Sequence, residues 1–365
     1  MTKSLEMNTN QSLWKVTVQT RNCIFRTMMR KSKRKSYIQL LTALLLSLNV
    51  MMLHAQQDAD TVRIETVGNY ITIPVTLNGK PMRFILDTGC GANVVFRYAV
   101  DNTVQVTADG DSIESSTGRT EAAEKIMGCL KVCKYDGDDT VPLYVAAVDS
   151  IMMLRGDGIV GMQYILERDD MNMKIDVQGK QVIFTRDKHM FDKEEGRKYR
   201  TRQTDKRLAI KTKVSPGIKI KDVVIDTGCD HLFSMNSSDF EAVMSGKHRE
   251  RFAHQVQGLK ASGMGGMFGL AEEPVTALRL EELTVAGLRF HDVDVETGRE
   301  SLLGFPFLQT ASVVFYHNGK RIKVEPYTAT QDYRIVRQEE KVKQGGYTMT
   351  YNKETVVEHY ISGKK

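Results

Sequence analysis

The feature that most constrains this chain is a four-residue motif, Asp-Thr-Gly-Cys, that occurs twice. The motif stands in "FILDTGCGANVVF" at residues 84–96 and in "VVIDTGCDHLFSM" at residues 223–235. Each copy follows a short run of branched apolar residues. Asp and Gly are common in turns after strands, so one copy would carry little information. Two copies in matching contexts predict two similar strand-to-turn units.

The residues around each motif match as well. Before Asp87 the segment "NYITIPVTLNGKPMRFIL" alternates and carries an Asn-Gly turn signal, and before Asp226 "RLAIKTKVSPGIKIKDVVI" repeats the plan. Both segments predict β-hairpins. An apolar pair and a glycine follow each motif, with Gly161 74 residues after Asp87 and Gly304 78 residues after Asp226. A further hairpin pattern follows each glycine. The chain is therefore predicted to be all-β, with a two-fold internal duplication.

Two other segments carry weaker patterns. A helix is predicted around residues 238–254, capped by Ser237 or Ser238. The polar tail from residue 327 onward predicts either a hairpin through Gly345-Gly346 or a segment without fixed structure.

The N-terminal 55 residues resemble an export signal. A cationic stretch at residues 30–35 precedes an apolar run at 38–53 and the small Ala55. Cleavage near Ala55 is predicted, which would leave a periplasmic or secreted protein without stable membrane insertion. An uncleaved anchor is the alternative. Nine of the 51 Lys and Arg residues and one of the 45 Asp and Glu residues lie in this segment, so the remainder carries a net charge of −2. That balance argues against a nucleic-acid partner.

An apolar strand, Asp-Thr-Gly and a later apolar-apolar-Gly, present twice, resemble the aspartic proteases of the retropepsin/pepsin clan. The chain is most similar to bacterial retropepsin-like aspartyl proteases, here duplicated in one chain, over residues 69–184 and 207–326. The resemblance implies two acid-protease β-barrel lobes related by a pseudo-two-fold axis, with an active-site cleft between them. The predicted domains are a leader (1–55), an N-terminal lobe (56–190), a charged linker (191–206), a C-terminal lobe (207–327) and a polar tail (328–365).

The resemblance also implies a function, that of an exported aspartic-type endopeptidase hydrolysing peptide bonds. Two carboxylates about 3 Å apart cannot both ionise, so Asp87 and Asp226 would share one proton and activate a water. The supporting residues implied by the family are Thr88, Gly89, Thr227 and Gly228, which would hold the two motifs together. A peptide or protein substrate, a monomer with an internal dyad, and no cofactor or metal are expected. Pairing of each half with a second molecule is the alternative.

Some residues depart from the family pattern. Cys90 and Cys229 replace the usual small residue, either as apolar fillers or as weak S–H donors to the outer carboxylate oxygens. Asp230 occupies the place of a substrate-binding aspartate or caps a turn, and His231 is expected at the surface. The glycine-rich segment at residues 261–269 is expected to form a closing flap over the cleft, with Gly263, Gly265 and Gly266 as its candidate residues. A weaker flap candidate surrounds Gly118.

The same residues bear on two other classes of function, a non-catalytic binding protein and an enzyme that forms an aspartyl phosphate. A non-catalytic peptide- or polymer-binding protein with the same fold is the main alternative, although a binder has no need for two adjacent carboxylates. Aspartyl-phosphate chemistry is disfavoured because it requires a further Asp two positions on, or an inserted Lys, which neither motif provides. The sequence has no C-x-x-C and no Cys/His cluster with zinc spacing past the leader, so it predicts no structural metal.

Overall fold

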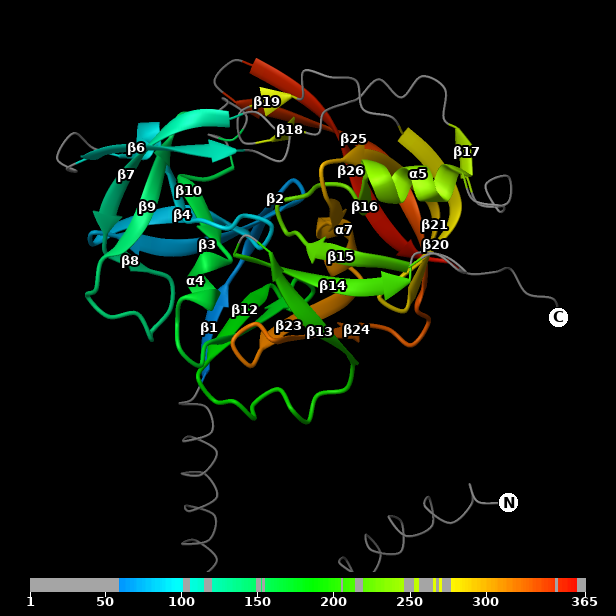
Figure 1. Ribbon diagram of the computed structural model, residues 1–365, viewed down its shortest axis with the longest axis horizontal. Coiled ribbons are helices and arrows are strands. Elements are labelled where there is room, and N and C mark those ends of the chain that lie inside the picture. Colours follow the sequence, from blue (N-terminus) through cyan, green and yellow to red (C-terminus); the bar gives the residue numbers. More distant parts are fainter. Residues whose placement is uncertain are drawn as a thin grey trace, which may run out of the picture. The chain divides into compact units, whose positions relative to one another are not determined.

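The alternating segments form strands, and the chain is mostly β-sheet (Figure 1). This computed structural model describes residues 59–100, 106–114, 120–148, 152, 155–204, 206–213, 219–245, 253–255, 265–266, 269–270, 277–344 and 347–359. The predicted leader lies outside the described residues. Among those residues, no helix has the length and apolar character needed to cross a membrane.

Two parts of the chain are named here by their residues, the N-terminal half (59–185) and the C-terminal half (207–326). The N-terminal half contains β1 (Ala59–Arg63), β2 (Glu65–Val67), β3 (Tyr70–Leu77), β4 (Lys80–Asp87), β5 (Val94–Phe96), η1 (Arg97–Ala99), β6 (Val106–Glu114), β7 (Thr120–Gly128), β8 (Leu130–Lys131), β9 (Val141–Ala146), β10 (Gly158–Gly161), α4 (Gln163–Leu166), β11 (Asn172–Asp176) and β12 (Gln181–Thr185).

The C-terminal half contains β14 (Arg207–Lys213), β15 (Lys219–Ile225), β16 (Phe233–Asn236), α5 (Ser237–Ser245), β17 (Ala253–Gln255), β18 (Gly265–Gly266), β19 (Gly269–Leu270), β20 (Ala277–Val285), β21 (Leu288–Gly298), β22 (Ser301–Leu303), α7 (Phe305–Leu308), β23 (Ala311–Tyr316) and β24 (Arg321–Pro326). Strand β13 (Arg197–Thr204) joins the halves, and β25 (Asp332–Gln344) and β26 (Tyr347–Glu358) follow them.

The strands around the two motifs follow one pairing scheme. In the N-terminal half the order is β3-β4-β10-β5-β9-β7, and in the C-terminal half it is β14-β15-β22-β16-β21-β20. The directions also agree: β10 is parallel to β4 and antiparallel to β5, while β22 is parallel to β15 and antiparallel to β16. In both halves the apolar-apolar-Gly strand therefore lies beside the strand that leads into Asp-Thr-Gly.

The predicted hairpins form where local turn signals are strong. Asn78 and Gly79 join β3 to β4 with φ angles of 51° and 78°, the left-handed conformation that an Asn-Gly turn of type I′ adopts. The later hairpins, β11–β12 and β23–β24, also form. They pair with each other through β11 and β23, so one large sheet contains strands from both halves.

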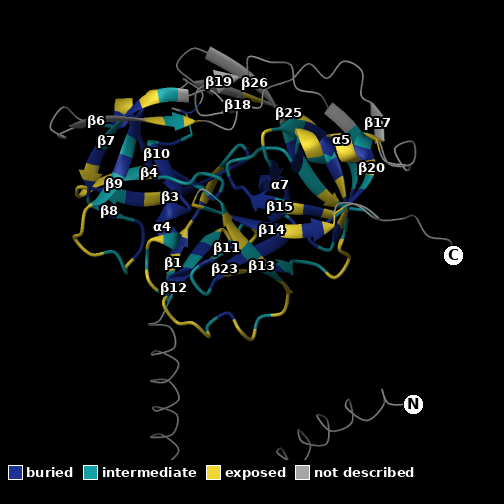
Figure 2. Ribbon diagram, in the orientation of Figure 1, coloured by how far each residue is buried: buried dark blue, intermediate teal, exposed yellow. Residues whose placement is uncertain are grey.

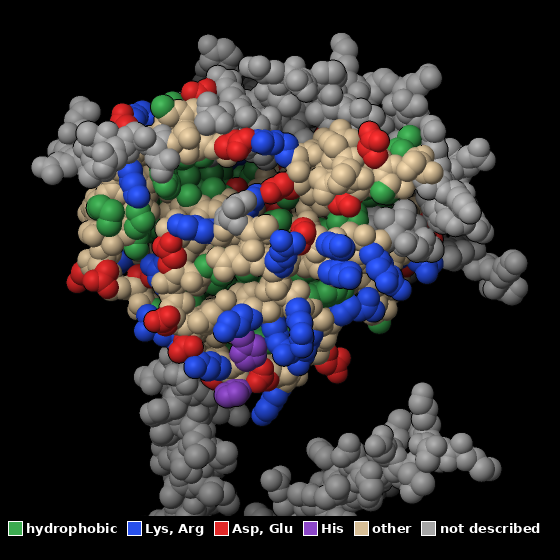
Figure 3. All heavy atoms as spheres, viewed as in Figure 1, with side chains coloured by type: hydrophobic (Ala, Val, Ile, Leu, Met, Phe, Trp, Pro, Cys, Tyr) green, Lys and Arg blue, Asp and Glu red, His purple; other side chains and the backbone are tan. Residues whose placement is uncertain are grey.

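The predicted linker differs from the structure. Residues 191–206 are highly charged, but Arg197–Thr204 form β13, which pairs with β24 and then with β14. Its backbone is thus part of the sheet that joins the halves, whereas most of its side chains face solvent. Figure 3 shows basic side chains gathered on the face over β13 and β14. The exposed cations of these strands and of β15 are Arg197, Lys198, Arg200, Arg202, Lys211, Lys213, Lys219 and Lys221.

Two other predictions are refined. Helix α5 ends at Ser245, earlier than predicted, and its cap is neither Ser237 nor Ser238. Instead the side-chain oxygen of Asn236 accepts a 2.8 Å hydrogen bond from the backbone N–H of Asp239. Phe240 and Val243 are buried on its inner face.

The polar tail is an integral part of the fold. It forms the hairpin β25–β26, here called the C-terminal hairpin, and β25 pairs in parallel with β21. Tyr333 and Ile335 of β25 are buried in the main core, which contains apolar side chains of both halves. Figure 2 shows buried residues on strands of both halves. Residues 59–365 form one compact unit.

Candidate active site

Each motif begins where a buried strand ends. In the N-terminal half Asp87 is the last residue of β4 and lies opposite Gly161 of β10. In the C-terminal half Asp226 follows β15, and its backbone N–H donates a 2.9 Å hydrogen bond to the carbonyl of Leu303 in β22. The three residues before each aspartate are buried, so the position of each aspartate is fixed by its neighbours.

The two motifs meet through their threonines within one chain. The backbone N–H of Thr88 donates to the hydroxyl of Thr227 (2.9 Å), and the backbone N–H of Thr227 donates to the hydroxyl of Thr88 (3.1 Å). The hydroxyls in turn donate to the carbonyls of Ile225 and Leu86 on the opposite half. Both threonines are almost completely buried. This reciprocal arrangement satisfies all four groups and locks the motifs side by side.

The glycines of the motifs allow the two aspartates to come close. A Cβ atom on Gly89 would lie 2.2 Å from Cγ of Asp226, and a Cβ on Gly228 would lie 2.5 Å from Oδ2 of Asp87. Each glycine also donates its N–H to the aspartate of its own motif, at 2.9 Å for Asp87 and 2.7 Å for Asp226. Each carboxylate thus lies against the backbone of the other motif.

The two carboxyl groups differ in how strongly their surroundings raise the pKa. Burial raises the pKa of Asp87, and part of this rise is offset by the hydrogen bond that it accepts from Asp226 and by backbone N–H donors. Burial raises the pKa of Asp226 further, well above its usual range, because the negative charge of Asp87 adds to the effect. The pair therefore disfavours ionisation of both groups at once, and Asp226 is the group that is harder to ionise.

The glycines after the apolar pairs support these loops from behind. A Cβ on Gly161 would lie 2.2 Å from the carbonyl oxygen of Ala92, and one on Gly304 would lie 2.0 Å from that of His231. The residues that follow them, Met162 and Phe305, donate N–H groups to the carbonyls of the motif cysteines at 2.8 Å in both halves. This close backbone contact explains why a glycine, and no larger residue, follows each apolar pair.

The motif cysteines do not reach the carboxylates as donors. Sγ of Cys90 lies 3.2 Å from the carbonyl oxygen of Ala92, and Sγ of Cys229 lies 3.6 Å from that of His231. Burial, followed by the charge of Asp87, raises the pKa of Cys90 to about 12. Burial and the charge of Asp226 raise the pKa of Cys229 well above its usual range. Both thiols are therefore neutral, and the S–H groups bond to backbone instead.

The prediction that His231 lies at the surface is wrong. Its side chain is only 16% exposed, and Nε2 lies 3.3 Å from Asp230 and 3.8 Å from Glu296. Burial alone would lower the pKa of His231, but the nearby carboxylates outweigh that effect and raise it to about 9. Those carboxylates belong to Asp230, Glu296 and Glu354. The imidazole is therefore positively charged at neutral pH and lies directly behind the second motif.

Asp230 contacts its neighbour His231 through its side chain and the N-terminal half through its backbone. Its side chain is 30% exposed and faces His231, and its carbonyl oxygen accepts a 2.9 Å hydrogen bond from Nδ2 of Asn69 in the N-terminal half. The first motif has Gly91 at the matching position. The surroundings of the two aspartates are therefore asymmetric.

Sequence reasoning missed Glu354. This residue comes from β26, in the segment interpreted as a polar tail, and its carboxylate accepts a 2.8 Å hydrogen bond from the backbone N–H of Leu232. Its other oxygen lies 3.5 Å from Arg337 of β25. The contact joins residues 122 positions apart, and no local pattern in the sequence signals it.

The predicted flaps are described only in part. Gly265 and Gly266 form β18, which pairs with β19, whereas Gly263 lies outside the described residues. Gly118 also lies outside them, in the chain between β6 and β7. Glu114, the last residue of β6, pairs with Arg299 of the C-terminal half.

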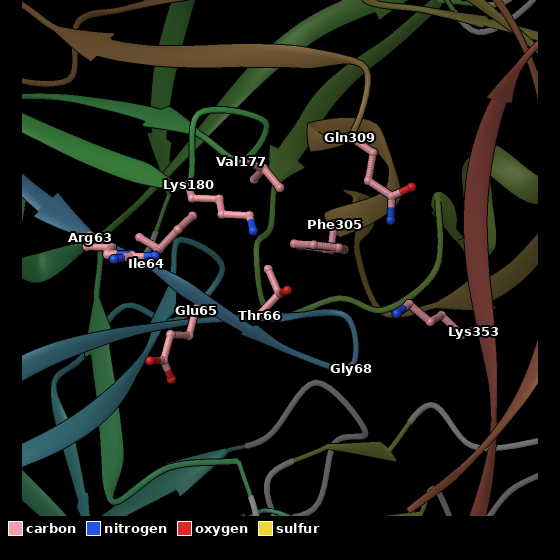
Figure 4. Close-up of a pocket in the computed structure, with 10 residues that line it drawn as sticks. All are labelled: Arg63, Ile64, Glu65, Thr66, Gly68, Val177, Lys180, Phe305, Gln309 and Lys353. Atoms are coloured by element: carbon pink, nitrogen blue, oxygen red, sulfur yellow. The ribbon is translucent and has the colours of Figure 1, made fainter.

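A separate pocket of about 490 Å³ lies apart from the aspartates (Figure 4). Its lining combines three basic side chains with one acidic and several apolar ones. It touches the motif region only through Phe305, whose N–H donates to Cys229. The basic residues are Arg63, Lys180 and Lys353, and neither aspartate contributes. Convergent reactive groups therefore point to the dyad and not to this pocket as the candidate active site.

Comparison of the sequence with protein-family models and with curated proteins gives no match.

Proposed function

We propose that the protein is an exported aspartic endopeptidase, built from two retropepsin-like lobes, in which Asp87 and Asp226 form the catalytic dyad. One observation carries the proposal. Two carboxyl groups from identical motifs lie against each other's backbone, and burial raises the pKa of both. A fold gains nothing in stability from such a pair, because burying like charges is costly. Their retention together is therefore best explained by chemistry.

Because the pKa of Asp226 is raised further than that of Asp87, we assign Asp226 the role of acid and Asp87 that of base. Asp87, ionised, would take a proton from a water as its oxygen attacks the peptide carbonyl carbon, while Asp226 would give its proton to the carbonyl oxygen. Collapse of the tetrahedral intermediate would break the C–N bond. Asp87 would then return its proton to the leaving nitrogen, and Asp226 would regain the proton from the oxygen. No covalent enzyme intermediate is required.

The pH dependence follows from the same pair. Cleavage should follow a bell-shaped profile, because the singly protonated dyad is the active form and its two titration steps bound the curve. Raised pKa values for both groups place this profile at higher pH than two isolated carboxyls would give.

The test begins with the protein recovered from the cell envelope of its expressing host, whose N-terminus is sequenced. A start near Gln56 is expected, and a start at Met1 or Met28 contradicts export. This protein is then incubated with a peptide library from pH 3 to 8, with and without pepstatin. Asp87→Asn and Asp226→Asn should each lower cleavage by at least about 10³-fold, because each removes the base or the acid.

The matched control is Asp222→Asn, an aspartate on β15 that forms an exposed ion pair with Arg202. It should cleave like the parent. The two dyad variants should be no less stable than the parent, since each removes a carboxyl whose charge burial disfavours. If the parent cleaves no peptide while remaining folded and binding peptides, the protein is a binder with this fold and the proposal is wrong.

A further inference from the structure

Three metal-binding side chains from separate segments meet at one end of the C-terminal hairpin. His291 lies in β21, Asp332 is the first residue of β25, and His359 directly follows β26. Strands β21 and β25 pair in parallel, and the backbone N–H of His359 donates a 2.9 Å hydrogen bond to the carbonyl of Asp332. The backbone therefore places the three residues next to one another on adjacent strands.

The ligand atoms of these side chains converge. Nε2 of His291 lies 2.7 Å from Oδ1 of Asp332, and Nδ1 of His359 lies 3.7 Å from the same oxygen. All three ligand atoms fall within 4.8 Å of one another, and the two imidazole rings are 4.2 Å apart between centroids. The side chains are between 19% and 31% exposed. The group is thus sheltered but reachable from solvent.

One buried polar atom in this group makes no hydrogen bond to a described residue. Nδ1 of His359 is buried and accepts or donates no hydrogen bond to any described residue. A buried imidazole nitrogen without a partner is costly, and natural structures normally satisfy such atoms. The unpaired nitrogen faces the same oxygen that His291 contacts, so a cation between the three groups would satisfy it.

We propose that His291, Asp332 and His359 form a Zn²⁺ site. Two imidazole nitrogens and one carboxylate oxygen are a donor set that zinc accepts, with the fourth position left for water. Calcium and magnesium, which prefer oxygen donors, fit it poorly. Small side-chain adjustments would bring the three atoms to the required distance of about 2.0–2.2 Å from the metal.

Neighbouring charges leave Oδ1 available to the metal. The other carboxylate oxygen of Asp332 lies 3.8 Å from Nη1 of Arg289. Nε of the same arginine lies 3.8 Å from the carboxylate of Glu282. Arg289 thus holds the second oxygen and leaves the first directed toward the histidines. The carboxylate of Glu282 partly neutralises the positive charge of Arg289, which weakens the repulsion between Arg289 and a bound cation.

The site would act by holding the C-terminal hairpin against β21. A metal that links β21, the start of β25 and the end of β26 closes the hairpin at its open end. The same hairpin supplies Glu354 to the loop after the second motif. Binding to the native state alone stabilises that state. The metal would therefore stabilise the fold without taking part in reactions at the dyad.

The test uses the mature chain, residues 56–365, stripped with EDTA and titrated with Zn²⁺ by calorimetry. We expect one Zn²⁺ per chain and a higher Tm at saturating metal. Separate His291→Ala and His359→Ala variants should each lose at least about tenfold in affinity, since even removal of supporting groups costs that much. Co²⁺ in place of zinc should give visible absorption that both variants abolish.

The matched control is His189→Ala, which removes another histidine paired with an aspartate, at 2.8 Å, but on an exposed turn. This variant should bind Zn²⁺ like the parent. If the parent binds no Zn²⁺, or if both site variants bind it unchanged, the proposed site does not exist. The readout is independent of peptide cleavage, so failure of one proposal leaves the other intact.

Discussion

The loop after Asp87 and the loop after Asp226 share their backbone contacts and differ in their chemical surroundings. In both, a glycine N–H donates to the aspartate, a threonine crosses to the other motif, and a distant glycine lies close behind. After the cysteine the two loops diverge. The first has Gly91, whereas the second has Asp230 and the charged His231, with Glu354 of the C-terminal hairpin behind them.

This comparison separates two properties of the dyad. The repeated residues set where the two carboxyl groups lie, because the contacts of the threonines, the motif glycines and the later glycines each occur twice. The unrepeated residues set the electrostatics of the surroundings, because only the second motif is followed by a cluster of buried charges. Asp226 is the more deeply buried of the two aspartates, and its pKa is raised further than that of Asp87.

Among the tests of this comparison, the largest effect is expected from breaking the shared geometry. Gly89→Ala and Gly228→Ala each place a methyl group within 2.5 Å of the opposite carboxyl group, so the two aspartates must move apart. Because misplacement by about 1 Å can cost about 10²-fold in rate, each variant should lose at least that much peptide cleavage. The losses should be similar if the two loops are equivalent.

Gly137→Ala is the control, since a Cβ there would meet Asp139 at an ordinary 3.7 Å. It should retain full cleavage. Circular dichroism distinguishes a displaced dyad from an unfolded chain. A large loss in one motif variant with none in the other would show that the loops are not equivalent.

Local features of this fold were predictable from sequence. The hairpin at residues 78–79 depends on an Asn-Gly turn and on alternation within eight residues of it. The two motifs and their later glycines predicted that Asp87 and Asp226 belong together, and the structure places them so. These signals are local or repeated, and both kinds can be read from one chain.

Features that depend on contacts between unrelated segments could not be predicted. The charge of residues 191–206 suggested a linker, but β13 pairs because two neighbouring strands offer open edges. His231 is polar and follows a turn, yet Glu354 and its hairpin cover it from 123 residues away. The three residues of the proposed zinc site are similarly separated in sequence and form no spacing motif.

A smaller effect would sharpen the asymmetry between the loops. The pKa of His231 is about 9 in the folded protein and 6.5 ordinarily, so its charge stabilises the native state fully below pH 6.5. That contribution, on the order of 3 kcal/mol, should be lost as pH rises from 6.5 through 9. Urea unfolding at pH 6, 7.5 and 9 should therefore show the parent losing stability relative to His231→Gln.

His189→Gln provides the control, because His189 is 80% exposed. Its stability should follow that of the parent at every pH. Parallel curves for the parent and His231→Gln would mean that His231 is not held in its charged form, and the asymmetry described above would lose its electrostatic basis.

The smallest effect on activity is expected at the two cysteines, the last position at which the loops agree. Cys90 packs beside the buried cluster of Ile85 and Val94, and Cys229 packs beside that of Ala209 and Val224. Their S–H groups face backbone carbonyls, and neither thiol ionises near neutral pH, so neither adjusts the dyad. Cys90→Ala and Cys229→Ala should each leave the pH profile of cleavage unchanged.

The two variants should still cost stability, by about 1 kcal/mol each, because a small, partly buried side chain is truncated. Cys133→Ala is a useful comparison: its thiol is buried far from the dyad and lies 3.1 Å from the hydroxyl of Tyr164, so it should lose at least as much stability with the same pH profile. A displaced acidic limb in either motif variant, absent from Cys133→Ala, would contradict the expectation. It would mean that the thiol does act on the shared proton, and that the cysteines belong to the dyad's chemistry and not only to its packing.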